Sequence, residues 1–160
     1  LLENVRLPLE EFTELPARAR DLVALTKLAL VGLREHASKL PAEISGGMRK
    51  RAAIARAMAL DPPILFLDEP SAGLDPITSA DLDELIKRLS GSLGVTFVIV
   101  THELPSVHAI ADRVVMLDKQ VKRIVAEGTP RQLAEQTEIT WVRRFFHRQA
   151  NPKGKPHPPR

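Results

Sequence analysis

The sequence predicts an α/β protein in which short apolar strands alternate with helices. Two apolar runs, at 64–67 and 95–100, each stop at polar residues, and a helical pattern at 77–89 separates them. Short all-apolar runs are typical of strands in a parallel sheet that is covered on both faces. The chain therefore contains a β-α-β unit, whose crossover is expected to be right-handed.

Composition narrows the class of protein. The chain has 160 residues, a net charge of +3, 4% aromatic residues and no cysteine. This length is enough for a buried core, and the absence of cysteine excludes disulfides and thiolate metal sites. Low charge and few aromatic residues give little reason to expect nucleic-acid binding. No apolar run approaches the roughly 18 residues of a membrane span.

The first 40 residues are expected to be mostly helical. A helix is predicted at 17–30, where Pro16 suits its start and Gly32 its end, while Pro8 should break the segment earlier. Lys27 is expected on the face opposite the apolar residues. The apolar residues at helical spacing are Leu22, Leu25, Leu28 and Ala29.

A glycine turn opens the next helix. Ser45-Gly46-Gly47 is unsuited to a helix interior, and a helical pattern follows it until Asp61 and two prolines stop the helix. Four cations lie between the apolar residues of this helix and are assigned to a solvated face without a site: Arg49, Lys50, Arg51 and Arg56.

The last third of the chain alternates again. A short helix at 104–111 leads to a strand at 113–117, which can pair with 122–126 as a hairpin. Thr129-Pro130 is an N-cap followed by a first-turn proline. A final helix at about 138–148 has an apolar stripe, and the proline-rich residues after it are expected to be disordered. The stripe consists of Trp141, Val142, Phe145 and Phe146.

Polar residues follow both predicted strands of the β-α-β unit. One strand ends in Asp68-Glu69 and the other in Thr101-His102. Parallel strands place these ends at one edge of the sheet, where α/β proteins bind ligands. Adjacent acids point in different directions, so one can hold a metal while the other faces a water. Mg²⁺ with phosphate co-ligands suits such acids.

The glycine turn is the third part of this pattern. Gly46 and Gly47, after Ser45, let a phosphate approach the backbone at a helix start, where N–H groups and the helix dipole favour an anion. Each part alone is more often a simple turn or a solvated loop. Together, and in this order, they indicate phosphoryl-transfer chemistry.

The residues up to about 136 resemble the ATP-binding subunits of ABC transporters. Four motifs carry the resemblance. The signature loop corresponds to Ile44-Ser45-Gly46-Gly47-Met48, and the Walker B strand corresponds to 64–69. The D-loop corresponds to Ser71-Ala72-Gly73-Leu74-Asp75, and the switch histidine corresponds to His102. Ile44 and Met48 depart from the common leucine and glutamine. The stretch 71–78, the opening 3–9 and the ending near 141–146 look like ATPases of the Mla/Mce type, which energise lipid trafficking between bacterial membranes.

The resemblance implies a role for each motif residue. Asp68 would hold Mg²⁺, Glu69 would act as the general base for the attacking water, and His102 would contact the γ-phosphate of ATP. Two ATPase domains pair head to tail in this family. Ser45, Gly46 and Gly47 would therefore contact the ATP bound to a partner domain, and Asp75 would link the two sites across the dimer.

The resemblance also implies partners and a location. The expected partners are a second ATPase subunit in a homodimer, membrane-spanning permease subunits facing residues 1–40, and a lipid-binding subunit of the Mce type. The location would be the cytoplasmic face of the bacterial inner membrane, held through the permease. For the final apolar stripe, packing against its own domain is the simpler interpretation, and contact of Trp141 with the second subunit is the alternative.

One family motif is absent. Nothing in the chain matches the phosphate-binding P-loop G-x-x-x-x-G-K-[ST], and the chain opens at Leu1 without methionine. We therefore expect an incomplete P-loop NTPase sheet, the C-terminal part of a subunit, that is poorly soluble and inactive alone. The predicted divisions are a helical subdomain at 1–60, the α/β core at 61–136, a helix at 137–149 and a disordered tail at 150–160.

Two alternatives remain open. The chain could belong to an importer ATPase for amino acids or other small solutes, or it could be a fragment with no function of its own or a non-hydrolysing interaction module. A small metallohydrolase using Asp68, Glu69 and His102 is disfavoured, because no second histidine stands at ligand spacing.

Overall fold

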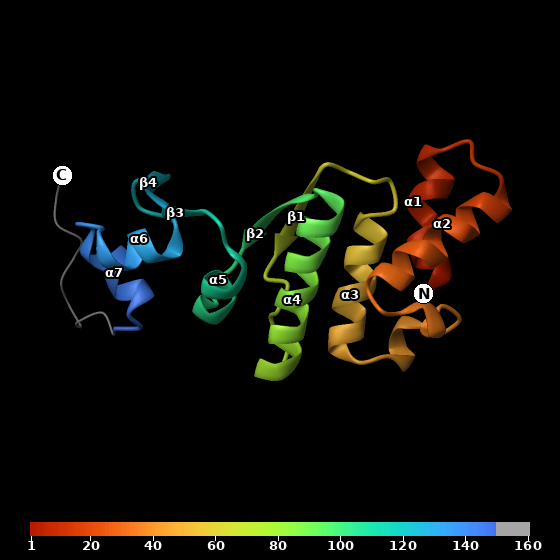
Figure 1. Ribbon diagram of the computed structural model, residues 1–160, viewed down its shortest axis with the longest axis horizontal. Helices are drawn as coiled ribbons and strands as arrows, with labels where there is room; N and C mark the ends of the chain where they lie inside the picture. The colour runs from red at the N-terminus through yellow and green to blue at the C-terminus, as the bar shows by residue number, and fades with distance from the viewer. Residues whose placement is uncertain (150–160) are drawn as a thin grey trace. The chain divides into compact units, whose positions relative to one another are not determined.

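The computed structural model describes residues 1–149, and the predicted disorder at 150–160 lies outside them. The chain divides into two compact units, Leu1–His102 and Glu103–Arg160. Figure 1 shows helices and strands alternating from α3 to β3, as the apolar pattern predicts for this part of the chain. An α/β architecture is therefore confirmed, and within residues 1–149 each unit contains one pair of strands.

The first unit combines a helical layer with a β-α-β unit (Figure 1). Helix α1 packs on α2 and α3, α2 packs on α3, and α3 packs on α4. The elements in chain order are α1 (Leu2–Phe12), α2 (Ala17–Leu30), the 3₁₀ turns η1 (Arg34–His36) and η2 (Pro41–Glu43), α3 (Gly46–Ala57), β1 (Ile64–Asp68), α4 (Pro76–Leu93) and β2 (Thr96–Val100).

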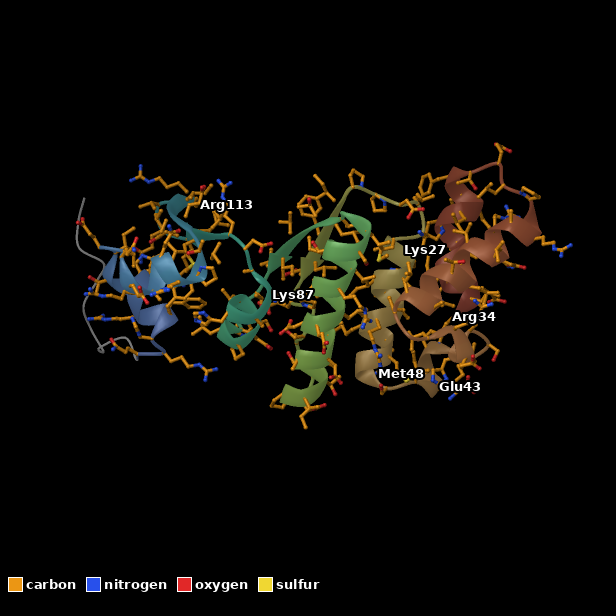
Figure 2. All side chains as sticks on the ribbon, in the orientation of Figure 1. Lys27, Arg34, Glu43, Met48, Lys87 and Arg113 are labelled. Atoms are coloured by element: carbon orange, nitrogen blue, oxygen red, sulfur yellow. The ribbon has the colours of Figure 1, made fainter. Side chains whose placement is uncertain are left out.

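Helix α2 has the predicted bounds but a different buried face. Ala24 and Leu28 are fully buried, whereas Leu22 is 64% exposed. Lys27 was expected on the outer face and is only 7% exposed, because its ammonium group pairs with Asp61 after α3. A buried charge needs such a partner, and here the partner comes from a segment distant in sequence. Figure 2 labels Lys27 in this part of the first unit.

The prediction that Pro8 breaks the first helix is wrong. Helix α1 continues through it, with Val5 and Leu9 buried on either side. Proline removes one helical hydrogen bond, to the carbonyl group of Asn4. Asn4 is exposed, so water can satisfy that carbonyl group. Arg6 also ties α1 to α2, since its guanidinium group lies 2.9 Å from Asp21 Oδ1.

Strands β1 and β2 form the predicted parallel pair, with Leu65 opposite Phe97 and Phe66 opposite Val98. Leu65 is buried and Phe97 half-buried on the face that α4 contacts through β2. Phe66 points the other way and is 76% exposed. The expectation that both faces are covered is therefore wrong for this chain. The exposed apolar residues of the open face are Ile64, Phe66, Val98 and Val100.

Helix α4 follows the predicted stripe and is well capped. The Asp75 carboxylate accepts hydrogen bonds from the first-turn N–H groups of Ile77 and Thr78, and Pro76 occupies the first turn. Gly94 ends the helix in the left-handed conformation, with φ of 66°. The buried side chains of the stripe are Leu82, Leu85, Ile86 and Leu89.

The second unit packs a hairpin against short helices. Its elements are α5 (Leu104–Ile110), β3 (Val114–Asp118), β4 (Arg123–Gly128), α6 (Pro130–Glu135) and α7 (Thr140–Phe146). Strands β3 and β4 pair antiparallel, as predicted. Val142 and Phe146 of α7 are buried in the core of this unit, and Trp141 and Phe145 pack against it partly buried. This packing supports the simpler interpretation of the apolar stripe.

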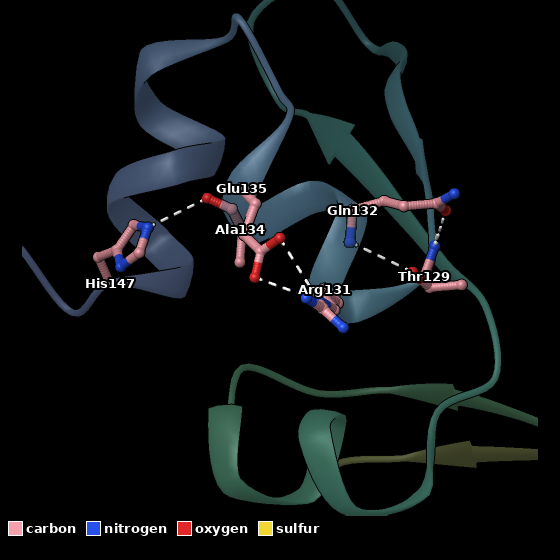
Figure 3. A network of polar contacts seen from close by, with 6 residues as sticks. All are labelled: Thr129, Arg131, Gln132, Ala134, Glu135 and His147. Carbon is pink, nitrogen blue, oxygen red and sulfur yellow. Dashed lines mark hydrogen bonds and ion pairs between the residues drawn. The ribbon is translucent and has the colours of Figure 1, made fainter.

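The start of α6 carries the predicted cap. Gln132 N–H donates to Thr129 Oγ1 at 3.2 Å, and Thr129 N–H donates to Gln132 Oε1 at 2.9 Å. This reciprocal pair is a capping box, drawn in Figure 3. His147 Nε2 donates to the Ala134 carbonyl group at 3.0 Å, which joins α7 to α6. Within residues 1–149, no helix combines the length and apolar character that crossing a membrane requires.

We predict that the adjacent residues Leu65 and Phe66 contribute differently to stability, because only Phe66 lies on the open face of the sheet. Leu65→Ala should cost about 2–5 kcal/mol of unfolding free energy, since Leu65 is buried. Phe66→Ala should leave that free energy nearly unchanged and reduce self-association, because the exposed ring contacts solvent. Urea denaturation and light scattering measure the two effects. An equal loss of stability in both variants would show that the face is covered in solution.

Candidate functional site

The predicted acid and histidine meet at the carboxyl ends of β1 and β2. His102 Nδ1 lies 2.7 Å from Glu69 Oε1. Thr101 Oγ1 is 3.4 Å from the other carboxylate oxygen of Glu69. Glu69 comes directly after β1 and the other two residues directly after β2, so the parallel register is what brings them together.

Glu69 stands in a constrained turn. Its φ of 44° is in the left-handed region, which a non-glycine residue rarely adopts. Its N–H donates to the carbonyl oxygen of Val100 at 2.9 Å, which extends the β1–β2 ladder by one residue. Its carbonyl oxygen accepts the N–H of Ala72 at 3.2 Å, which closes the following turn. The backbone around the carboxylate is thus fixed on both sides.

Asp68 occupies a different position from its neighbour. It pairs with Val100 in the strand register and is exposed on the same face as Phe66. The two acids therefore separate, with Glu69 directed at His102 and Asp68 on the open face. Within residues 1–149, no group of three His, Cys, Asp or Glu side chains could hold a metal ion by itself. A metal at Asp68 would need oxygen ligands from outside these side chains.

The glycine turn forms the start of α3. Ser45 is the N-cap, and its Oγ accepts the N–H of Met48 at 3.2 Å. Gly46 and Gly47 are the first helical residues. First-turn N–H groups have no intrahelical partner, so an anion can bind them. Arg49 Nη1 donates to the Ile44 carbonyl group at 2.7 Å and closes the turn from behind.

Gly47 is also required by packing within the chain. A Cβ atom at this position would lie 2.5 Å from Thr78 Cγ2 of α4, which is too close for any real contact. At Gly46 the nearest atom would be Leu74 Cδ2 at 3.5 Å, an ordinary contact. The second glycine of the turn therefore lets α3 approach the start of α4, and the first does not have this constraint.

The Asp75 carboxylate fixes the Thr78 side chain. Thr78 Oγ1 donates to Asp75 Oδ2 at 2.6 Å, and Thr78 N–H donates to Oδ1 at 3.0 Å. The side-chain bond from Thr78, followed by its backbone bond, lowers the pKa of Asp75 below the ordinary value of 3.8. The Asp75 carboxylate thus caps α4 in its own chain. By holding the Thr78 side chain, it also keeps the Thr78 methyl group against Gly47.

Comparison with known proteins assigns this chain to one family. Residues 3–72 match the family described as ABC transporter. The intermembrane phospholipid transport system ATP-binding protein MlaF of Escherichia coli K12 is 47% identical over 133 residues, which are 83% of this chain and 49% of that protein. MlaF of Haemophilus influenzae is 42% identical over 88% of this chain and 52% of its own length. The chain belongs to the ABC transporter ATP-binding family.

Solved structures agree with this assignment. An ABC transporter described as a putative metal-chelate type, in an inward-facing conformation, has a TM-score of 0.77 at 27% identity, covering 91% of this chain and 58% of that one. The dimeric ATP-binding cassette MJ0796, bound to ADP and Pi after hydrolysis, has a TM-score of 0.66 at 34% identity, covering 80% and 55%. The chain spans about half the length of the curated relatives it matches.

Two residues of this chain make contacts that the sequence pattern did not predict. Arg49 and Lys50 were assigned to a solvated face. Arg49 closes the signature turn, and Lys50 Nζ donates to the Glu69 carbonyl group at 3.1 Å. Lys50 lies three residues after Gly47 and four residues before Ile54, and both of these residues are buried. Residues at this spacing share one face of a helix, so the spacing could have identified the inward position of Lys50.

The signature glycines should respond differently to alanine. Gly47→Ala should destabilise the chain by about 1–3 kcal/mol, because its Cβ collides with a methyl group that Asp75 holds in place. Gly46→Ala should be neutral or stabilising by up to about 1 kcal/mol, since alanine favours a helix. Thr78→Ser removes Cγ2 and keeps the hydroxyl group, so it should recover most of the loss in Gly47→Ala. Urea denaturation of the two single variants, Thr78→Ser and the double variant measures this coupling.

Equal losses for Gly46→Ala and Gly47→Ala, or no recovery in the double variant, would contradict this account of the contact.

Proposed function

We propose that this chain is the signature-loop part of an ATP-hydrolysing subunit of an ABC transporter that energises phospholipid transport between bacterial membranes. The observation that carries the proposal is the contact of Glu69 with His102 at 2.7 Å, beside a glycine-started helix in the family's order of motifs. The phospholipid assignment is supported by relatives named for phospholipid transport at 47% and 42% identity.

The importer alternative has one observation in its favour. The methionine import ATP-binding protein MetN of Leifsonia xyli is 42% identical over 89% of this chain. This identity equals that of the Haemophilus influenzae relative. Because the ATPase subunit is not expected to contact the cargo, cargo identity has to be tested with the permease present.

Glu69 is suited to be the general base. Its carboxylate is half-buried, held by a fixed turn and directed at His102, so a water between the acid and a phosphate would be oriented before reaction. His102 would then contact the γ-phosphate and sense its loss. Both carboxylate oxygens of Glu69 have a partner after β2, because His102 Nδ1 contacts Oε1 and Thr101 Oγ1 donates to Oε2.

Asp68 is suited to Mg²⁺. It is a single exposed carboxylate, and Mg²⁺ binds through one or two carboxylates together with water and nucleotide phosphates. The ion would neutralise charge on the phosphate oxygens during transfer. ATP would also be contacted by Ser45, Gly46 and Gly47 from a partner subunit, in keeping with the dimer of the ADP-bound relative.

The partners follow from the same proposal. A second copy of the subunit would complete each site, and Asp75 would lie between the two sites. Residues 1–40 would face membrane-spanning permease subunits, and a lipid-binding subunit of the Mce type would complete the transporter. The subunit would then act at the cytoplasmic face of the inner membrane, held there through the permease.

Nucleotide binding and hydrolysis test the enzymatic part. We expect the chain alone to bind a fluorescent ATP analogue weakly and to show no turnover, because it contains no P-loop motif. A longer form that includes the upstream residues of the same gene should bind and hydrolyse ATP. Glu69→Gln should reduce its kcat by at least about 10²-fold while nucleotide binding persists.

Two results would contradict this proposal. One is tight nucleotide binding by the chain alone, and the other is full turnover in Glu69→Gln. Glu84→Gln, at an exposed acid of α4 outside the proposed site residues, serves as the matched control.

Cargo is tested with the assembled transporter. With permease and lipid-binding subunits reconstituted in liposomes, ATP should drive transfer of labelled phospholipid, and Glu69→Gln should stop it. Methionine added to the same vesicles should neither be transported nor stimulate ATP hydrolysis. Transport of methionine without phospholipid transfer would favour the importer alternative.

A further inference from the structure

Lys50 connects the signature helix to the turn that carries Glu69. It lies on α3 one turn after Gly47, and its ammonium group donates to the Glu69 carbonyl oxygen at 3.1 Å. The side chain is half-buried, unlike the neighbouring Arg49, which is exposed. The contact spans 19 positions of sequence and joins two motifs of the site.

The Glu69 carbonyl oxygen that accepts this hydrogen bond belongs to a residue with an unfavourable backbone conformation. Glu69 has a φ of 44°, and its carbonyl oxygen already accepts the N–H of Ala72 at 3.2 Å. A left-handed conformation at a residue with a side chain persists only where surrounding contacts over-determine it. The ammonium group of Lys50 adds a charged donor to this oxygen, and charge-assisted hydrogen bonds are stronger than neutral ones.

The simplest alternative is an ordinary surface lysine that touches a convenient carbonyl group. Three observations oppose it. Lys50 stands at helical spacing from buried Gly47 and Ile54, its side chain is half-buried, and the contacted residue is the one with the left-handed backbone. A solvated lysine would lose side-chain freedom here without compensation.

We propose that Lys50 is a positioning residue that holds the Glu69 turn, and through it the carboxylate facing His102, in register with the signature helix. The proposal rests on the function proposed above for Glu69. Its consequence is that movement of α3 changes the orientation of the catalytic acid in the same chain. The signature loop would thus affect the orientation of Glu69 in its own subunit as well as contact the nucleotide of a partner subunit.

Hydrogen exchange tests the structural half of the proposal without ATP. In Lys50→Met, the amide protons of Glu69 and Ala72 should exchange faster by on the order of tenfold, while the melting temperature changes little. Lys50→Arg keeps a cationic donor and should restore most of the protection. Lys87→Met is the matched control, because Lys87 is exposed on α4 (Figure 2). Unchanged exchange in Lys50→Met would overturn the proposal.

Kinetics in the longer, ATP-hydrolysing form test the functional half. Lys50→Met should lower kcat by roughly tenfold with KM for ATP nearly unchanged, because the acid is misplaced and the nucleotide contacts remain. Lys50→Arg should recover much of kcat, and Lys87→Met should equal the unaltered protein. Loss of kcat with normal exchange at Glu69 would also contradict a positioning role.

Glu69→Gln is measured in parallel so that the two proposals fail separately. If Glu69→Gln retains turnover, the proposed function fails, and the exchange result alone decides whether Lys50 holds the turn. If Glu69→Gln abolishes turnover and Lys50→Met does not reduce it, the positioning proposal fails and the proposed function stands.

Discussion

The close approach of α3 to the start of α4 at Gly47 is the constraint on which the site depends. A Cβ atom there would lie 2.5 Å from the Thr78 methyl group, and Asp75 holds Thr78 in that orientation. The signature turn is therefore positioned by the helix that follows the D-loop, within one chain. This explains the second glycine by packing, in addition to any phosphate that the turn binds.

A second fixed element meets the first at Glu69. The β1–β2 ladder continues through the N–H of Glu69 to Val100, and this register brings His102 to the carboxylate. Helix α3 therefore contacts two segments, the start of α4 through Gly47 and the Glu69 turn through Lys50.

Local sequence patterns predicted the helices and strands well. They could not predict contacts between residues that are distant in the sequence. The strands at β1 and β2, the stripe on α4 and the Thr129-Pro130 cap all follow from spacing and turn chemistry. Lys27 was misplaced because its partner Asp61 is 34 residues away. Pairing of Glu69 with His102 was predictable in outline, since parallel strands share an edge, whereas the roles of Lys50 and Gly47 depend on how two helices pack.

The open face of the β1–β2 sheet carries both exposed apolar side chains and the predicted metal ligand Asp68. The open face of β1 and β2 carries four large apolar side chains, which is why both faces were expected to be covered. Phe66 and Asp68 are two residues apart on one strand, so they share that face. Any segment that buried Phe66 would also lie beside Asp68. A segment that covered Phe66 would therefore also be placed to supply the further oxygen ligands that a metal at Asp68 would need.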